Sequence, residues 1–401
     1  MRYVEIPVSQ LNFGMYVSEL DRPWEETPFM FQGFRLEDPE DLDTLKKLCK
    51  QVTVDNDQSD FYTAQPKPAA NKIKTKIKIA DEMPVAERTF EATRKLIGKV
   101  MKDARIGKSI DIPETREAVN DMVASVERNP NAMSLLTRLR QKDAYTAEHS
   151  LSVSILSTSL GKSLGLPTKE LRTLGLAGML HDIGKVLSPD EVLLKEDKLT
   201  MEEMKIMKKH PVDGREILFS SQGVQDHSLA VAMGHHEKLD GSGYPIGAVG
   251  DAISEYTKIV SIVDTYDAVT SDRSYDKGRS NIEAFDILMA GRGSSWESNY
   301  VIKFIETIGI YPPGSIVKLS SDEIAVVVEH NPLYRLKPLL VVIQNPHDLE
   351  NGMRMVDLAD DQKDKGGKPI KIVKVMSHSN NAEFLDKLRR KGLFGNLPSI
   401  D

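Results

Sequence analysis

Five histidines and two aspartates in the middle of the chain have the types and the spacing that metal chemistry requires. The chain of 401 residues has nine histidines, and these five either continue an apolar helical stripe or stand where an apolar helix ends. A carboxylate buried among apolar residues needs a partner, and a cation is the natural one. The seven residues are His149, His181, Asp182, His210, His235, His236 and Asp264.

The number and the kind of these side chains favour a centre of two metal ions. Taken singly, each residue could be an ordinary core histidine or a surface acid. Together, five imidazoles and two carboxylates are too many for one tetrahedral ion, and they suit two octahedral or five-coordinate ions that share a carboxylate. The only cysteine of the chain, Cys49, takes no part, which argues against a structural zinc site.

Helices must position these residues. His149 begins a stripe of apolar residues, spaced by three and four, that runs to Leu164, so its side chain is predicted to face the core. His181 and Asp182 are predicted in the last turn of a helix for which Gly184 offers the C-cap.

Three further helices are predicted to carry the other four residues. His210 is expected to end a helix that a capping box at Thr200 begins, after an apolar stripe of methionines. His235 and His236 are expected to close the helix that contains LAVAMG. Asp264 lies in an apolar run that is predicted to be helical and capped by Ser254.

The loop that follows the paired histidines reads HHEKLDGSGYP. Gly241 and Gly243 allow tight turns and a close approach of a large ligand. Asp240 is expected to brace the loop, and Glu237 is expected to be the partner of a ligand histidine. Tyr244 could stack on a base, contact a partner protein or pin the loop to the domain.

Patterning divides the chain into several domains, mainly helical in the middle. We predict a small α/β domain over residues 1–60, a linker over 61–83, connecting helices over 84–134, a helical domain over 135–310 and a β-rich module with a tail over 311–401. The individual elements expected outside the helical domain are strands near 4–6, 15–17, 52–55, 73–80, 315–320, 324–330 and 338–344, and helices near 39–49, 90–101, 113–127 and 381–393.

Composition limits the setting and the partners. The net charge of −7 argues against a surface for nucleic-acid polymers, but leaves room for a local basic pocket. One cysteine permits no intrachain disulfide and fits a reducing compartment. The start, MRYVEIPVSQL, does not resemble a signal peptide, and no apolar run approaches the ~20 residues that span a bilayer, so a cytoplasmic location without a membrane span is expected.

Four motifs together resemble the HD-GYP domain, a bacterial subgroup of the HD phosphohydrolases. They are HDIGK at 181–185, HP at 210–211, HHEKLDGSGYP at 235–245 and DTYDAVTSDRSY at 264–275, and the likeness covers about residues 140–310. The stretch LNFGMYVSELDRPWEETPFMFQGF also resembles a domain that often precedes HD-GYP domains. This resemblance implies a mostly helical, metal-dependent phosphodiesterase of bacterial signal transduction. Such an enzyme opens cyclic di-GMP to linear pGpG, in some members continues to GMP, and so lowers the level of the messenger.

The resemblance also implies which residues hold the metals, with iron or manganese as the ions. His149, His181, Asp182 and Asp264 would supply the basic HD set, while His210, His235 and His236 would complete a second ion that Asp182 bridges. Some members carry a glutamate at the position of Tyr145 and bind a third ion, so we expect two here.

The expected catalytic residues are Asp182 and Lys185, and the expected substrate contacts are Lys185, Tyr244, Arg273 and Lys277. Lys185 could neutralise charge on the phosphoryl oxygens, or it could simply satisfy a helix dipole. Arg273 could hold a phosphate through two hydrogen bonds, or it could pair with a neighbouring aspartate.

The loop at 272–277 departs from the family pattern. Family members often read DRPYRK there, whereas Ser274 and Asp276 replace the proline and a basic residue in this chain, so phosphate binding by this loop is expected to differ.

Two other functions stay open at this stage. The enzyme could instead hydrolyse cyclic GMP-AMP, or the chain could be a scaffold that senses a cyclic dinucleotide without cleaving it. The expected partners are the cyclic dinucleotide and signalling proteins that contact the GYP loop or the N-terminal domain. A homodimer is the candidate assembly.

Overall fold

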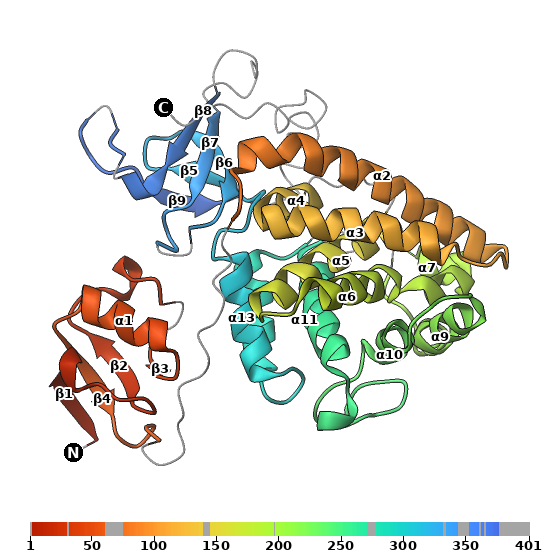
Figure 1. The fold of residues 1–401 in the computed structure, drawn as a ribbon, viewed down its shortest axis with the longest axis horizontal. Helices are drawn as coiled ribbons and strands as arrows, with labels where there is room; N and C mark the ends of the chain where they lie inside the picture. Colours follow the sequence, from red (N-terminus) through yellow and green to blue (C-terminus); the bar gives the residue numbers. More distant parts are fainter. Residues whose placement is uncertain are drawn as a thin grey trace.

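The computed structural model describes residues 2–29, 32–60, 75–138, 145–195, 197–271, 278–331, 334–343, 353–360, 362–364 and 366–376. It has three parts, which Figure 1 colours from red through green to blue along the chain: an N-terminal unit, a body of helices and a β-rich C-terminal module. The fold is therefore mostly helical with two small sheets, as the sequence predicts.

The N-terminal unit is an antiparallel sheet covered by one helix. Its elements are β1 (Tyr3–Pro7), β2 (Tyr16–Leu20), β3 (Phe34–Arg35), α1 (Pro39–Leu48) and β4 (Gln51–Asp55), with the strand order β1-β4-β2-β3. Alternate residues of β2 and β4 face α1, which gives the unit a core of its own. The strands and the helix predicted here are confirmed, and only β3, which is two residues long, was missed.

Twelve α-helices make up the described part of the central body (Figure 1). They are α2 (Ile79–Arg105), α3 (Ile112–Arg128), α4 (Pro130–Thr137), α5 (Tyr145–Ser163), α6 (Thr168–Leu180), α7 (Asp190–Leu193), α8 (Met201–Met207), α9 (His210–Ser220), α10 (Asp226–Gly234), α11 (Glu255–Thr270), α12 (Asn281–Ala290) and α13 (Ser298–Ile308).

Helix α5 lies at the centre of this body and joins its two hydrophobic cores. Leu151 and Ile155 belong to the core shared with α2, α3 and α6, whereas Val153 and Leu156 belong to the core shared with α11 and α13. Helix α6 approaches α5 closely at Gly178, where a Cβ atom would lie 3.2 Å from the Cα of Ser154. The two helices are thus held together one turn before His181.

The C-terminal module is a five-stranded antiparallel sheet. Its strands are β5 (Ile316–Leu319), β6 (Ile324–Glu329), β7 (Leu339–Ile343), β8 (Met353–Asp357) and β9 (Ile372–Val375), in the order β8-β7-β6-β5-β9. Alternate side chains point to opposite faces, so Val326 and Val328 join the core of the helices while Ala325 and Val327 fill a separate core. The predicted packing of a β-module on the helices is confirmed.

Some predicted elements differ from the structure. The strand expected at 73–80 is wrong for its described part, because residues 75–78 are irregular and α2 begins at Ile79, inside the predicted linker. Strands β8 and β9 were missed. The helix expected at 381–393 lies outside the described residues. Among the described helices, none is long and apolar enough to cross a membrane.

Candidate metal centre

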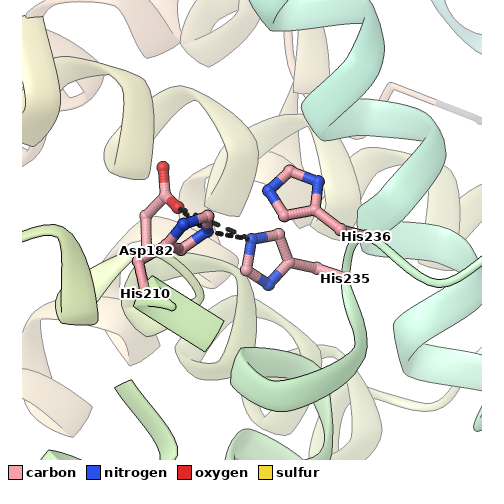
Figure 2. A group of neighbouring side chains, drawn as sticks. All are labelled: Asp182, His210, His235 and His236. Atoms are coloured by element: carbon pink, nitrogen blue, oxygen red, sulfur yellow. Dashed lines mark hydrogen bonds and ion pairs between the residues drawn. The ribbon is translucent and has the colours of Figure 1, made fainter. Parts of the chain in front are cut away.

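The structure brings all seven predicted residues to one buried place. The donor atoms form three overlapping groups, and within each group every atom lies within 4.8 Å of the others. The groups are Asp182, His210, His235 and His236, drawn in Figure 2; His149, His181 and Asp182; and His181, His235 and Asp264. All of these side chains are buried except His236, which is partly exposed.

The His181-Asp182 pair stands where α6 ends and a short 3-10 turn begins. His181 is the C-cap of α6, so its place at the helix end is confirmed. The expectation that Gly184 is the C-cap is wrong. Gly184 instead permits a very close backbone contact. A Cβ atom there would lie 2.0 Å from the carbonyl oxygen of His210 and 2.4 Å from the amide nitrogen of Gly214. This contact seats α9 against the turn and brings His210 to Asp182.

The predicted position of His210 needs correction. The capping box of Thr200 and Glu203 is present, but α8 ends at Met207 and His210 opens α9, with Pro211 in its first turn. The methionine stripe does not lead to a core, because α8 buries none of its residues and Met204 is 42% exposed. Periodicity failed here because a break in the chain separates α8 from the histidine.

The helix ends predicted for the other residues are confirmed. Helix α10 ends at Gly234, and His235 is its C-cap. Ser254 caps α11 by accepting a hydrogen bond from the amide of Thr257 at 3.2 Å, and Asp264 lies within that helix.

Hydrogen bonds to the backbone fix the protons of three histidines. The Nδ1 atom of each lies beside a carbonyl oxygen, which can only accept, so Nδ1 carries the hydrogen and Nε2 presents a lone pair. The pairs are His181 with Gly178 at 2.8 Å, His210 with Met207 at 2.7 Å and His235 with Ala232 at 3.0 Å.

These lone pairs point at one another and at a carboxylate. The Nε2 atoms of His210 and His235 are 3.1 Å apart, and they lie 3.3 and 3.5 Å from Oδ1 of Asp182. Among the described residues, neither that oxygen nor Nε2 of His181 has a hydrogen-bond partner. Electron pairs that converge without a hydrogen repel one another, and a cation between them removes the repulsion. The donor set therefore fits metal ions.

The two oxygens of Asp182 face different histidines. Oδ1 faces His210 and His235, whereas Oδ2 lies 3.4 Å from Nε2 of both His149 and His181. Asp264 also has its Oδ1 3.1 Å from His149 and its Oδ2 3.9 Å from His236. A carboxylate with one oxygen toward each half of a donor set has the geometry of a bridging ligand.

Electrostatics keep the carboxylates of this cluster ionised. Burial would raise the pKa of Asp182, but Lys185 and His181 outweigh it and hold that pKa well below its usual range. Burial lowers the pKa of His181, but Asp182 and Asp264 outweigh it and raise that pKa to about 9. Without a metal ion a proton therefore occupies Nε2 of His181, and a bound ion would replace that proton there. Burial, opposed by Asp182, lowers the pKa of His235 to about 4. The cluster thus attracts positive charge, and at neutral pH it contains ionised carboxylates together with a neutral imidazole at His235.

A carboxylate that the sequence analysis missed orients His149. Oδ2 of Asp267 lies 2.6 Å from Nδ1 of His149, and Asp267 is 2% exposed. This contact turns Nε2 of His149 toward Asp182 and Asp264, as partners of ligand histidines commonly do. The signal was available in DTYD, because Asp267 stands one helical turn after Asp264.

Lys185 contacts the cluster directly. Its Nζ donates a hydrogen bond to Oδ2 of Asp182 at 2.5 Å, and its side chain is 22% exposed. The ammonium group therefore lies beside the carboxylate that faces both halves of the donor set.

The GYP loop folds back on the paired histidines. Gly241 has φ +79°, and at Gly243 a Cβ atom would lie 2.5 Å from the Cα of Glu237, so both glycines are needed. The ring of Tyr244 stacks on His236 with the ring centroids 4.6 Å apart. Of the roles open to Tyr244, this contact supports the one in which the ring pins the loop, here against His236 of the cluster.

Two acidic residues hold this loop. Asp240 accepts a hydrogen bond from the amide of Ser242 at 2.9 Å, which confirms its bracing role. Within the described part of the chain, Glu237 forms no hydrogen bond to a histidine of the cluster, contrary to expectation. Its carboxylate accepts from the backbone amides of residues 246–248 at 2.7, 3.2 and 3.0 Å. A buried glutamate can accept hydrogen bonds from three amides of a tight loop at once, and Glu237 makes these contacts in place of the expected one to a histidine.

Some predicted contacts lie outside the described part of the chain. Arg273, Ser274, Asp276 and Lys277 belong to the segment 272–277, which the structure does not describe. Tyr145 is the first residue of α5, and the expectation of two ions stays a prediction.

Comparison with known proteins identifies the family. The HD domain matches residues 119–298, and a domain of unknown function matches residues 3–115. The chain is 34% identical over 349 residues to a cyclic di-GMP phosphodiesterase of Pseudomonas aeruginosa, and the match covers 84% of both chains.

Two further relatives and one solved structure cover less or are more distant. A cyclic di-GMP phosphodiesterase response regulator of Xanthomonas campestris is 39% identical over 178 residues, or 44% of this chain and 47% of the relative. A 3′3′-cGAMP-specific phosphodiesterase of Vibrio cholerae is 37% identical over 159 residues, which are 39% of this chain and 36% of the relative. An HDG"Y"P protein of Bdellovibrio bacteriovorus is 19% identical with a TM-score of 0.48, and covers 75% of this chain and 98% of its own. From the match over most of its length and from its motifs, the chain belongs to the HD-GYP group of the HD-domain family.

Proposed function

We propose that the protein is a metal-dependent phosphodiesterase that hydrolyses cyclic di-GMP to linear pGpG, with GMP as a further product to be tested, and so lowers the level of this messenger. The observation that carries the proposal is the buried cluster of seven donor residues. At its centre, Oδ1 of Asp182 and Nε2 of His181 have no hydrogen-bond partner among the described residues. The relative that matches 84% of the chain is named for this activity, which supports the same substrate.

We propose two divalent ions in this cluster, iron or manganese. One would be held by His149, His181 and Asp264, the other by His210, His235 and His236, with Asp182 shared between them. When bound, such ions supply a nucleophile from water at neutral pH and neutralise the charge of a phosphodiester. The opposite directions of the two Asp182 oxygens support the sharing.

The chain's own residues would orient the substrate around the ions. Lys185 places a positive charge beside Asp182, where it can stabilise charge that develops on phosphoryl oxygens. Tyr244 covers His236 at the rim of the site, where its ring offers a surface for a guanine. Arg273 and Lys277 are proposed phosphate contacts, and the loop that carries them departs from the family pattern. Signalling partners at the GYP loop or the N-terminal unit, and a homodimer, stay predictions.

A second candidate substrate is cyclic GMP-AMP. Relatives named for 3′3′-cGAMP match at 37% and 34% identity, but each covers less than half of this chain. The broader match to a cyclic di-GMP enzyme favours cyclic di-GMP. A scaffold without catalysis is disfavoured, because a protein that only binds would not need seven donors aimed at one point.

The test compares the two substrates. The full chain is reconstituted anaerobically with Fe(II) or Mn(II), and the hydrolysis of cyclic di-GMP and cyclic GMP-AMP is followed by chromatography. We expect kcat/KM to favour cyclic di-GMP by about tenfold or more. A site whose polar groups bind guanine discriminates against adenine, because adenine leaves those groups without hydrogen-bond partners. Equal or faster cleavage of cyclic GMP-AMP would overturn the substrate assignment. Binding without cleavage of either, in metal-loaded protein, would favour the scaffold.

A further inference from the structure

A second cavity lies where the β-rich module meets the helices. It has a volume of about 250 Å³ and lies between the end of α11, the start of α12 and strands β5 and β9. Its described lining residues include no member of the metal cluster. The nearest lining residue on α11, Thr270, stands six positions after Asp264. The cavity is smaller than the pockets that hold drug-sized molecules, so it fits a small ligand.

Arg138 of this cavity has no counter-charge among the described residues, and Arg279 has only the longer-range charge of Glu283. Nη2 of Arg138 donates to Oδ1 of Asn281 at 2.6 Å and to the hydroxyl of Tyr266, and both acceptors are neutral. In the part of the chain that the structure describes, no carboxylate forms an ion pair with Arg138 or with Arg279, which also lines the cavity. A guanidinium that is partly removed from water without an opposite charge is costly, and an anion relieves that cost.

Two other partly buried arginines of this protein are paired with carboxylates. Arg128, whose side chain is 35% exposed, donates to both oxygens of Glu82 at 2.7 and 2.8 Å. Arg354, whose side chain is 38% exposed, donates to both oxygens of Glu323 at 3.1 Å. Arg138 has no such carboxylate among the described residues, so an anion in the cavity would supply the charge that Glu82 and Glu323 supply to Arg128 and Arg354.

The chemistry of the lining selects the class of anion. Among the described residues, hydrogen bonds engage only Nη2 of Arg138, so Nε and Nη1 are available for the two-pronged contact that arginine makes with phosphate oxygens. Glu283 is the one carboxylate among the described lining residues, and its Oε2 accepts from the amide and the hydroxyl of Ser280, both at 2.8 Å. That carboxylate caps α12 and also offsets the charge of Arg279 at longer range, so the described lining keeps the one positive charge of Arg138. An apolar wall of Ile316, Val375 and Met376 adjoins these charged residues.

We propose that this cavity binds a small phosphate monoester, held by Arg138 and Arg279 beside the apolar wall. This site shares no described residue with the metal cluster, and the proposal does not depend on the proposed phosphodiesterase activity. It touches two parts of the fold at once, because Arg138 contacts Tyr266 of α11 and a Cβ atom at Gly314, just before β5, would lie 2.6 Å from its Cβ.

The test measures binding of inorganic phosphate and of GMP to the full metal-loaded chain by calorimetry. Since phosphate can also bind metal ions, the measurement is made in the parent and in Asp182→Ala, which removes the shared metal ligand. We expect one binding site to survive Asp182→Ala and to weaken by about tenfold or more in Asp182→Ala/Arg279→Met, the loss expected for a charged hydrogen bond. GMP binding more tightly than phosphate would identify a nucleotide as the source of the group, and equal binding would identify phosphate itself.

The control removes the same charge elsewhere. Arg172 is exposed on α6, and Asp182→Ala/Arg172→Met is expected to bind like Asp182→Ala. Arg138→Met is a second probe, and its thermal melting reports whether the contact to Tyr266 was needed for folding. Arg279 is exposed, so Arg279→Met keeps the test valid even if Arg138→Met unfolds. The proposal is overturned if all phosphate binding disappears in Asp182→Ala, or if the Arg172 and Arg279 variants lose binding equally.

Discussion

Two fully buried carboxylates in this protein are treated in opposite ways. Glu82, between α2 and α3, is 0% exposed, and its oxygens accept from Arg128 at 2.7 and 2.8 Å and from Ser125 at 2.6 Å. Asp182 is also 0% exposed, yet its Oδ1 has no hydrogen-bond donor among the described residues and faces two imidazole lone pairs. A saturated buried charge holds a fold together, whereas an unsaturated one is kept for a ligand.

The largest expected effect comes from removing a donor on the unsaturated side. His235→Ala should reduce turnover of cyclic di-GMP by about a thousandfold, since a metal ion contributes ~4 kcal/mol or more to such a transition state. Steady-state kinetics at saturating metal, with metal content measured on the same sample, check this. His227→Ala is the control, because His227 is exposed on the same helix. Turnover near that of the parent would remove His235 from the site.

Glu82, whose hydrogen bonds are satisfied, should affect the stability of the fold and not the turnover of the enzyme. Glu82→Gln should lower the free energy of unfolding by about 2–3 kcal/mol, because it leaves the guanidinium of Arg128 without its partner. Urea unfolding measures the loss. Glu114→Gln, which breaks the exposed pair with Lys99, should cost less than about 0.5 kcal/mol. Metal content should stay normal in both variants. A loss of metal in Glu82→Gln would contradict the claim that Glu82 stabilises the fold without contributing to the metal centre.

Asp267 tests whether orientation of a ligand matters as well as its presence. Asp267→Asn should weaken metal affinity by about 10- to 100-fold, because His149 loses the partner that fixes its ring. Metal titration against a competing chelator gives the affinity, and added metal should restore much of the turnover. Asp286→Asn, an exposed change on α12, should have no effect. An Asp267→Asn protein with unchanged affinity would show that His149 needs no such partner.

A third carboxylate, Glu329 of β6, is partly buried and forms no ion pair with a cation among the described residues. Burial and then the charge of Asp357 raise its pKa to about 7, despite a hydrogen bond from Asn131. Because the folded-state pKa lies above the unfolded one, its contribution to stability is complete below about pH 4.5 and is lost as the pH rises through 7. We expect a loss of about 3 kcal/mol over that window.

Unfolding measured from pH 4.5 to 8 checks this effect. The difference between the parent and Glu329→Gln isolates it from His330, whose pKa burial lowers to about 4 and which acts in the opposite direction as the pH falls. Glu306→Gln, exposed on α13, serves as the control. Equal pH profiles for the parent and Glu329→Gln would contradict the raised pKa.

Sequence patterns predicted the donor residues of the cluster better than the helix boundaries and packing contacts that position them. The seven donors could be identified because each ends or continues an apolar helical stripe, and the motif spacing adds to that signal. The boundary between α8 and α9 could not be predicted, because the exposed methionines of α8 have the same spacing as a buried apolar stripe. The Gly184 contact depends on how α9 packs, which no local pattern encodes. Short edge strands such as β3 and β9 depend on pairing with distant partners.

The most direct test of the central claim joins metal content to turnover in the parent, Asp182→Ala and Glu82→Gln. The account predicts two ions per chain and hydrolysis of cyclic di-GMP in the parent and in Glu82→Gln. In Asp182→Ala it predicts that both ions and the activity are lost. Hydrolysis by metal-free protein, or by Asp182→Ala at the parent's rate, would contradict the assignment of this cluster as the metal centre of a phosphodiesterase.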